Sequence, residues 1–185
     1  APGDALITAN VIRCIKEKYP VLKINCITPH PKLIELDPNI DKINQPETFY
    51  SFDSTYWELI VRKEKSQNII EHNMTRLGIV TYDYKAAFYL SEKEKDWAKK
   101  EITQFKKPIL AFCTKSKEPV KNWPEANWLE LIENFKEEFS IIQLGDDTEP
   151  SFEGVHRFAG KLSMRESAAI LSTAIYFIGP DSLLM

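Results

Sequence analysis

The sequence is poor in the residues that build metal centres and disulfide frameworks. Its 185 residues include three cysteines and three histidines, and neither set shows the short paired spacing of a zinc site. Cys14, Cys26 and Cys113 are an odd number of widely separated thiols, which is typical of a reducing compartment. We therefore expect neither a metal site nor disulfide bonds.

The chain also lacks an excess of positive charge and any long apolar run. Its 24 Lys and Arg residues and 27 Asp and Glu residues give a formal net charge of -3, so no general field favours wrapping by nucleic acid. No stretch approaches the roughly 20 apolar residues of a membrane-spanning helix. Because 43% of the residues are hydrophobic, a substantial core is possible, and we expect a cytoplasmic globular protein.

Helical and strand patterns alternate along the chain. Ile7, Val11 and Cys14 share one helical stripe that ends at Pro20. The first half is predicted to contain a helix at 5–19, a strand at 23–29, a helical turn and a short strand within 32–43, a strand at 56–62, and helices at 66–78 and 91–105. The helix at 91–105 has Ser91 as N-cap and Glu94 completing a capping box.

From Lys106 onward the pattern is that of a parallel sheet. The apolar run "PILAFC" is typical of a strand that is buried on both faces. Strands at 108–113, within 140–147 (where the strand runs into a loop), at 155–160 and at 175–181 alternate with helices at 124–139 and 163–174. A buried helix face is predicted for Trp128, Leu131, Ile132 and Phe135. We therefore predict an α/β protein of two units, 1–105 and 106–185, with helices on both faces of the second sheet.

Ligands in open parallel sheets bind beyond the carboxyl ends of the strands, and four such loops carry polar groups. Gly3 and Asp4 precede the first predicted helix; Asp4 either caps that helix or serves as a general base. The loop "TKSKEPVKNWP" contains Thr114, Ser116 and Lys121 before a helix start, a combination that suits phosphate. A solvated loop is the alternative, and the absence of glycine excludes a Walker loop.

The other two loops follow later strands. Gly145 and Asp146 in "LGDD" form either a tight turn or a site for ribose hydroxyls. Asp181 and Ser182 in "GPDSLLM" either cap the next helix or contact a sugar or phosphate. Each loop is weak evidence for a ligand site, and their order along the chain is more specific.

That order resembles glycosyltransferase family 9, the ADP-heptose:lipopolysaccharide heptosyltransferase group. The similarity is strongest in "GDALITANVIRCIKEKYP", "PNIDKI", "KNWPEANWLELIENF", "IIQLGDD" and "LSMRESAAILSTAIYFIGPDS". The resemblance implies a GT-B fold of two Rossmann-like domains, an acceptor-side domain at 1–105 and a nucleotide-sugar-binding domain at 106–185. It also implies the transfer of a sugar from a nucleotide-diphosphate donor, with inversion and without a metal ion. The sugar implied by the family is heptose and the donor ADP-heptose.

The resemblance also implies roles for particular residues. Asp4 matches the base that deprotonates the acceptor hydroxyl, and Lys121 matches the lysine on the donor phosphates. The implied donor-binding set is Thr114, Ser116, Lys121, Gly145, Asp146, Leu162, Asp181 and Ser182. Within it, Thr114 or Ser116 accompanies the lysine, Gly145 and Asp146 position the nucleoside, and Leu162 lies near the base. The family often uses a glutamate for the ribose, and its counterpart here is left open.

The implied partners are the donor and a glycolipid or protein acceptor, with peripheral association at the inner face of the bacterial membrane. The family places a strand before the Gly-Asp turn and further elements after Asp-Ser, so we expect these residues to be an excerpt, inactive alone. Leu183 stands where the family usually has glycine. A sugar-nucleotide epimerase on the same fold and a non-catalytic nucleotide-sugar-binding protein are the alternatives.

Overall fold

A computed structural model describes residues 2–46, 50–54, 59, 61–63 and 67–180. The chain separates into two compact units, Ala1–Tyr89 and Leu90–Met185. The join predicted near Phe105 lies beyond helix α4 (Glu92–Ile102), and this helix packs on a helix of the second unit. The join between the compact units therefore lies between Tyr89 and Leu90. The strand predicted at 56–62 falls largely outside the described residues.

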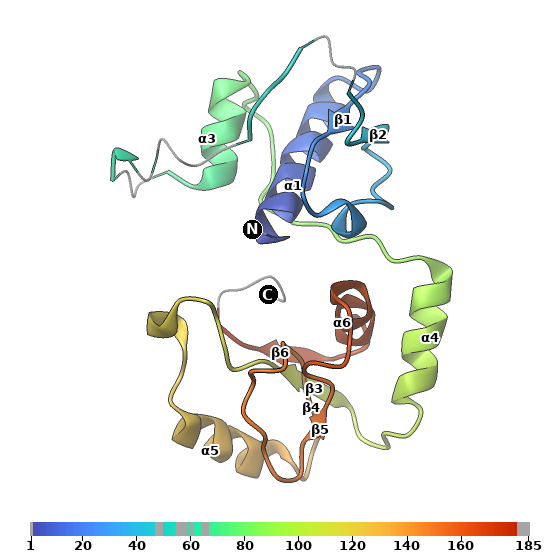
Figure 1. Cartoon of the computed structure of the whole chain (residues 1–185), viewed down its shortest axis with the longest axis vertical. Coiled ribbons are helices and arrows are strands. Elements are labelled where there is room, and N and C mark those ends of the chain that lie inside the picture. Colours follow the sequence, from blue (N-terminus) through green and yellow to red (C-terminus); the bar gives the residue numbers. More distant parts are fainter. Residues whose placement is uncertain (1, 47–49, 55–58, 60, 64–66, 181–185) are drawn as a thin grey trace. The chain divides into compact units, whose positions relative to one another are not determined.

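In the part of the first unit that the structure describes, two longer helices accompany a short parallel sheet (Figure 1). Its elements are α1 (Pro2–Lys18), β1 (Asn25–Cys26), the 3-10 helix η1 (Pro31–Leu33), β2 (Lys42–Ile43) and α3 (Ile69–Arg76). The two strands pair in parallel, with Asn25 opposite Lys42. Helix α1 begins three residues earlier than predicted because Pro2 suits a first helical turn, and Asp4 therefore lies inside that turn rather than before it.

Helices α1 and α3 build the core of the first unit. Val11 and Cys14 of α1 pack against Ile70 and Met74 of α3. Both α1 residues belong to the apolar stripe that the sequence predicts for this helix. Asn68 caps α3 by accepting a hydrogen bond from the Ile70 N–H at 2.8 Å. Both helices are therefore fixed by their own sequence signals and by one shared apolar cluster.

The chain that leaves α3 runs back along α1. Asn10, which is buried, donates from Nδ2 to the carbonyl of Lys85 at 2.5 Å. Arg13 forms an ion pair with Asp83 and donates to the Lys85 carbonyl at 2.9 Å. The hydrogen bond between the Arg13 and Asp83 side chains raises the pKa of Arg13 and lowers the pKa of Asp83 to about 2. Residues 83–85 are therefore tied to the middle of α1.

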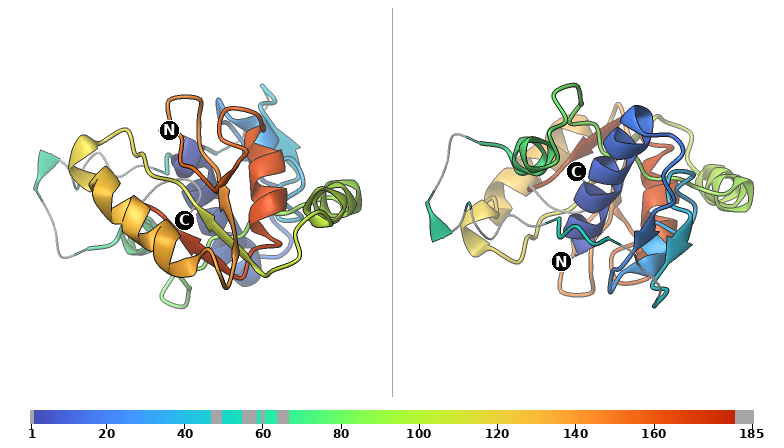
Figure 2. Two further views of the ribbon diagram at one scale, coloured as in Figure 1. Left: turned by 90° about the horizontal axis from the view of Figure 1, so that it is seen from below. Right: turned by 90° about the horizontal axis from the view of Figure 1, so that it is seen from above.

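The second unit is a four-stranded parallel sheet with the order β5-β4-β3-β6. Its elements are α4 (Glu92–Ile102), β3 (Ile109–Phe112), η2 (Pro119–Lys121), α5 (Glu125–Phe135), β4 (Ser140–Gln143), β5 (His156–Arg157), α6 (Met164–Leu171) and β6 (Tyr176–Ile178). Helices α5 and α6 lie on opposite faces of the sheet (Figure 2). The covered parallel sheet predicted from the sequence is confirmed.

Alternate residues of the central strand contact the two covering layers, because side chains of a strand point to opposite faces in turn. Ile109 and Ala111 belong to the cluster that contains α4 and α6 residues, whereas Leu110 and Phe112 belong to the α5 cluster. Phe112 stacks on Trp128 of α5, with ring centroids 5.4 Å apart. All four β3 residues are buried, as the continuous apolar run predicts.

The buried face predicted for α5 is shorter than expected. Trp128, Leu131 and Ile132 are buried, but Phe135 is 37% exposed. Phe135 is the last residue of α5 and packs edge-on against Phe139, with ring centroids 6.0 Å apart. Its ring therefore covers the end of the helix instead of the sheet.

One carboxylate both starts α4 and holds α6 against it. Glu94 accepts hydrogen bonds from the Ser91 backbone and hydroxyl, each at 2.7 Å, which completes the predicted capping box. It also pairs with Arg165 of α6, with distances of 2.5 Å to Nε and 2.8 Å to Nη2. The Arg165 side chain is 10% exposed and the Glu94 side chain 22%. The Arg165 hydrogen bonds lower the pKa of Glu94 from 4.5 to about 2.

We expect Glu94→Gln to lower the free energy of unfolding at pH 7 by about 3 kcal/mol, the size of this pKa shift. Glutamine can still close a capping box, so the loss isolates the charge. A lowered pKa stabilises the fold above pH 4.5, and this contribution disappears as the pH falls toward 2. Denaturation at several pH values, followed by tryptophan fluorescence, should therefore show a flatter acid dependence in the variant.

Glu92→Gln is the matched control on the same helix. The Glu92 side chain is 79% exposed and forms a surface ion pair with Lys95 one turn away, so its loss should cost under about 1 kcal/mol. Equal losses in the two variants would contradict the role given to Glu94.

Candidate functional site

The strand-end loops of the second unit meet at one edge of its sheet. Strands β3, β4 and β6 are parallel neighbours, so the chain leaves all three on the same side. Residues 113–118 follow β3 and are called the β3 loop; residues 144–155 follow β4 and are called the β4 loop. These are the loops in which the sequence places most of the predicted donor-binding residues.

Glu149 joins the two loops. Its carboxylate accepts hydrogen bonds from the Thr114 N–H at 2.9 Å, the Thr114 hydroxyl at 2.5 Å and the Lys115 N–H at 3.1 Å. A fourth bond comes from Gln143 Nε2 at 3.3 Å. Glu149 is only 5% exposed, and a buried carboxylate needs such donors to offset its desolvation. The β4 loop is thereby fastened to the backbone of the β3 loop.

Gly145 makes room for this carboxylate. Its φ is +122°, a conformation that L side chains rarely adopt. A Cβ at this position would stand 2.6 Å from Glu149 Oε1, well inside van der Waals contact. Glycine is therefore required here by the approach of Glu149 as well as by the backbone, which supports the turn interpretation of "LGDD" without excluding a ligand.

The buried side-chain amide of Gln143 also holds the β4 loop in place. Gln143, at the end of β4, donates to the carbonyl of Pro150 at 2.8 Å and accepts from Arg157 Nη1 at 3.1 Å. Arg157 also donates to the carbonyls of Pro150 at 3.1 Å and Asp147 at 3.3 Å. The β4 loop is thus held by strands β4 and β5 together.

The three polar residues predicted in the loop after β3 have different surroundings. Thr114 is buried and its hydroxyl is bound to Glu149. Ser116 is fixed by its own loop, because its N–H donates to Asn122 Oδ1 at 2.7 Å and its hydroxyl accepts from the Glu118 N–H at 3.3 Å. Lys121 lies at the end of η2, with Nζ 3.4 Å from the Glu118 carboxylate. Of the two hydroxyls that the sequence left as alternatives beside Lys121, that of Ser116 is the one outside the Glu149 network.

Asp146 lies at the tip of the β4 loop and caps its own turn. Its Oδ1 accepts from the Thr148 N–H at 2.9 Å and the Thr148 hydroxyl at 2.6 Å. These bonds hold the pKa of Asp146 below its ordinary value. Leu162 is half-buried and packs against the core cluster beneath α4 and α6. Asp181, Ser182 and Leu183 lie outside the described residues.

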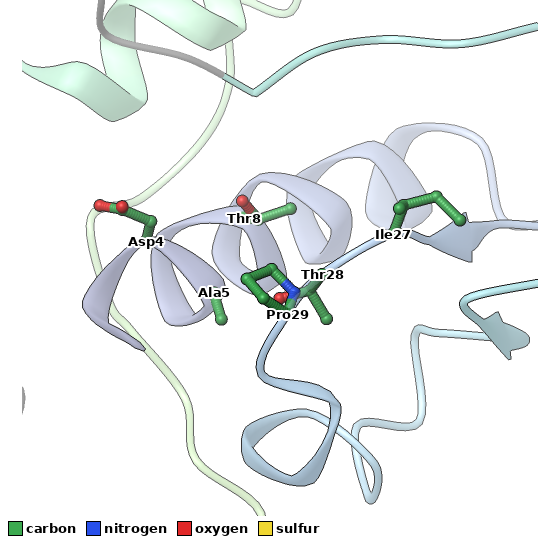
Figure 3. Close-up of a pocket in the computed structure, with 6 residues that line it drawn as sticks. All are labelled: Asp4, Ala5, Thr8, Ile27, Thr28 and Pro29. Carbon is green, nitrogen blue, oxygen red and sulfur yellow. The ribbon is translucent and has the colours of Figure 1, made fainter. Parts of the chain in front are cut away.

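Asp4 belongs to the first unit, where it borders a pocket of about 170 Å³. The pocket is lined by Asp4, Ala5 and Thr8 of α1 and by Ile27, Thr28 and Pro29 after β1 (Figure 3). Thr8 is one helical turn beyond Asp4, so both project from the same side of the helix (Figure 3). The chain after β1 is fixed by Asn44, which accepts from the Thr28 N–H at 2.8 Å and donates to the Thr28 carbonyl at 2.9 Å.

Sequence reasoning missed Glu149, Thr8 and Thr28. The i, i+4 spacing of Asp4 and Thr8 was visible in the sequence, as was the position of Thr28 just after a predicted strand. Glu149 had no comparable signal, because its partner Thr114 is 35 residues away. Its role depends on two strands being neighbours.

Across the part of the chain that the structure describes, no group of three His, Cys, Asp or Glu side chains is arranged to hold a metal ion. Among the same residues, no helix combines the length and apolarity needed to cross a membrane.

The sequence profile described as "Glycosyltransferase family 9 (heptosyltransferase)" matches residues 53–185. The chain belongs to glycosyltransferase family 9. This confirms the resemblance drawn from the sequence motifs and identifies the protein as a glycosyltransferase. None of the curated protein sequences compared matches the chain.

Solved structures of family 9 proteins share the fold. A family 9 glycosyltransferase from Veillonella parvula DSM 2008 matches with a TM-score of 0.76 and 13% identity, over 100% of this chain and 74% of that one. The E. coli heptosyltransferase WaaC with ADP matches with a TM-score of 0.63 and 14% identity, over 100% and 79%. The dodecameric iron-containing glycosyltransferase TibC from enterotoxigenic E. coli H10407 matches with a TM-score of 0.64 and 18% sequence identity, over 100% of this chain and 52% of that one. The predicted α/β fold of GT-B type is thereby confirmed.

Proposed function

We propose that this family 9 glycosyltransferase transfers heptose from ADP-heptose to a hydroxyl of a lipopolysaccharide-core or related acceptor, with inversion and without a metal ion. The observation that carries the donor assignment is the pair of fastened loops at the sheet edge of the second unit, beside Lys121. The names of two similar structures, WaaC "with ADP" and TibC "in complex with ADP-D-beta-D-heptose", support the same donor class.

In this proposal, leaving-group charge develops on the donor diphosphate as the bond to the sugar breaks. The ammonium group of Lys121 and the N-terminal end of α5, which begins four residues later, stabilise that charge. Gly145 and Asp146 border the nucleoside, and Leu162 lies near the base. Asp181 and Ser182 complete the donor set near the pyrophosphate.

Asp4 takes the proton of the acceptor hydroxyl as general base. Its pocket suits a polyhydroxylated acceptor, because three of the six residues that line it, Asp4, Thr8 and Thr28, have polar side chains. A glycolipid acceptor would bring the protein to the inner face of the bacterial membrane from the cytoplasm. A glycosylated protein is the other acceptor class considered.

The decisive experiment incubates the intact protein with ADP-heptose and an acceptor preparation and identifies the product by mass spectrometry. We expect ADP release and an acceptor heavier by one heptose. A changed sugar on the nucleotide, with no acceptor product, would support the epimerase instead. Tight donor binding by calorimetry without any reaction would indicate a non-catalytic binding protein. Leu183, in place of the family's usual glycine, is the reason to consider that class.

A further inference from the structure

The β3 loop is held in one shape by groups of the protein itself. The N–H groups of Thr114 and Lys115 both donate to Glu149, and the N–H of Ser116 donates to Asn122. Three consecutive backbone donors are therefore satisfied before any ligand arrives. A loop that is already ordered loses less conformational freedom on binding, which favours affinity.

The acceptor in this arrangement has to be a carboxylate. Four donors converge on Glu149, from Thr114 N and Oγ1, Lys115 N and Gln143 Nε2. An amide at this position would have to turn its NH₂ group toward one of these donors, so at least one bond would become a clash of two donors. The side chain of Lys115, which donates to the Thr148 carbonyl, adds a further link between the loops.

Direct contact between this carboxylate and a diphosphate would be repulsive. Its oxygens are instead committed to the loop, and its 5% exposure leaves little surface for a ligand. Any influence of Glu149 on a donor diphosphate must therefore act through the loop that it holds.

We propose that Glu149 is a positioning residue, which fixes the β3 loop in the conformation that receives the donor diphosphate between this loop and Lys121. The inference rests on the proposed function. It assigns Glu149 to the phosphate side of the donor, through the backbone, rather than to a direct contact with the nucleoside.

Two probes separate these roles, because ADP carries a ribose and inorganic pyrophosphate does not. We expect Glu149→Gln in the intact protein to lower the affinity for ADP and for pyrophosphate by a similar factor, about 10-fold, as measured by calorimetry. Weaker ADP binding with unchanged pyrophosphate binding would mean direct contact with the nucleoside and would overturn the proposal. Unchanged binding of both probes would overturn it as well.

The matched control is Glu153→Gln, because Glu153 is an exposed glutamate in the same β4 loop. This variant should bind both probes like the wild type. Thr114→Val and Thr114→Ser test the same contact from the other loop. Valine removes the hydroxyl bond to Glu149 and should weaken both probes, whereas serine keeps the hydroxyl and should restore binding. Equal binding by the valine and serine variants would count against the proposal.

Amide hydrogen exchange in the ligand-free protein separates a failure of this inference from a failure of the proposed function. We expect the Thr114 and Lys115 amides to exchange at least 10-fold faster in Glu149→Gln, with the amides of α5 unchanged. Unaltered exchange at Thr114 and Lys115 would overturn the positioning role. Failure of the wild type to bind either probe, with accelerated exchange in the variant, would overturn the donor assignment instead.

Discussion

Replacing Asp4 with asparagine is expected to lower kcat about 10²–10⁴-fold, the usual contribution of a general base. Donor affinity should change less than about twofold, because the donor set belongs to the second unit. Asparagine keeps the size of the side chain but cannot accept the proton of the acceptor hydroxyl. Initial rates with ADP-heptose and acceptor, together with calorimetric titration of ADP, measure both quantities.

Asp53→Asn is the control for this result, because Asp53 is an exposed aspartate of the same unit whose backbone carbonyl, which the substitution keeps, accepts a hydrogen bond from Arg76 at 2.9 Å. It should retain full turnover. If Asp4→Asn kept near-normal transfer, another group would have to be the base. A parallel loss of ADP affinity would indicate a folding defect rather than loss of the base.

Lys121→Ala is expected to raise the Kd for ADP about 10–100-fold, because a charge-assisted hydrogen bond to phosphate contributes about 1.5–3 kcal/mol. The effect should appear mainly in the donor KM and to a smaller degree in kcat. Titration with ADP and steady-state kinetics with varied donor would measure it. The affinity of the wild type should also fall as salt is added, since the contact is ionic and partly exposed.

Lys117→Ala is the matched control for Lys121, since it removes one exposed positive charge from the same stretch of chain. We expect it to shift donor affinity less than about threefold through long-range charge alone. Equal effects of the two substitutions would mean that the loop attracts the donor by net charge, without a specific lysine contact. Glu118→Gln, which releases Lys121 from its ion pair, should leave donor binding intact.

Much of the second unit could be predicted from local signals. Ser91 with Glu94 and Ser163 with Glu166 are capping boxes in the sequence, and both begin helices in the structure. The apolar run at β3 correctly indicated a central strand. These signals are reliable because each depends on residues within one helical turn or one strand. The position of the join was harder, since it depends on which unit α4 packs against.

The candidate site was less accessible to sequence reasoning for a physical reason. Thr114 was predicted as a donor ligand, but its hydroxyl is bound to a glutamate from another loop. Such a contact exists only after β3 and β4 have paired, and no local pattern announces it. Asp4 lies in the first turn of α1 rather than before the helix as predicted, and the pocket that it shares with Thr28 forms only because the chain after β1 lies beside α1.

The contacts of Asn10 and Arg13 with residues 83–85 have a consequence for where proteases cut the protein. Proteases cut where the backbone can detach from its neighbours. Because these two side chains anchor the departing chain to α1, residues 83–85 should resist cleavage even though they are exposed. Loss of Arg13 should therefore make this stretch a new cleavage point.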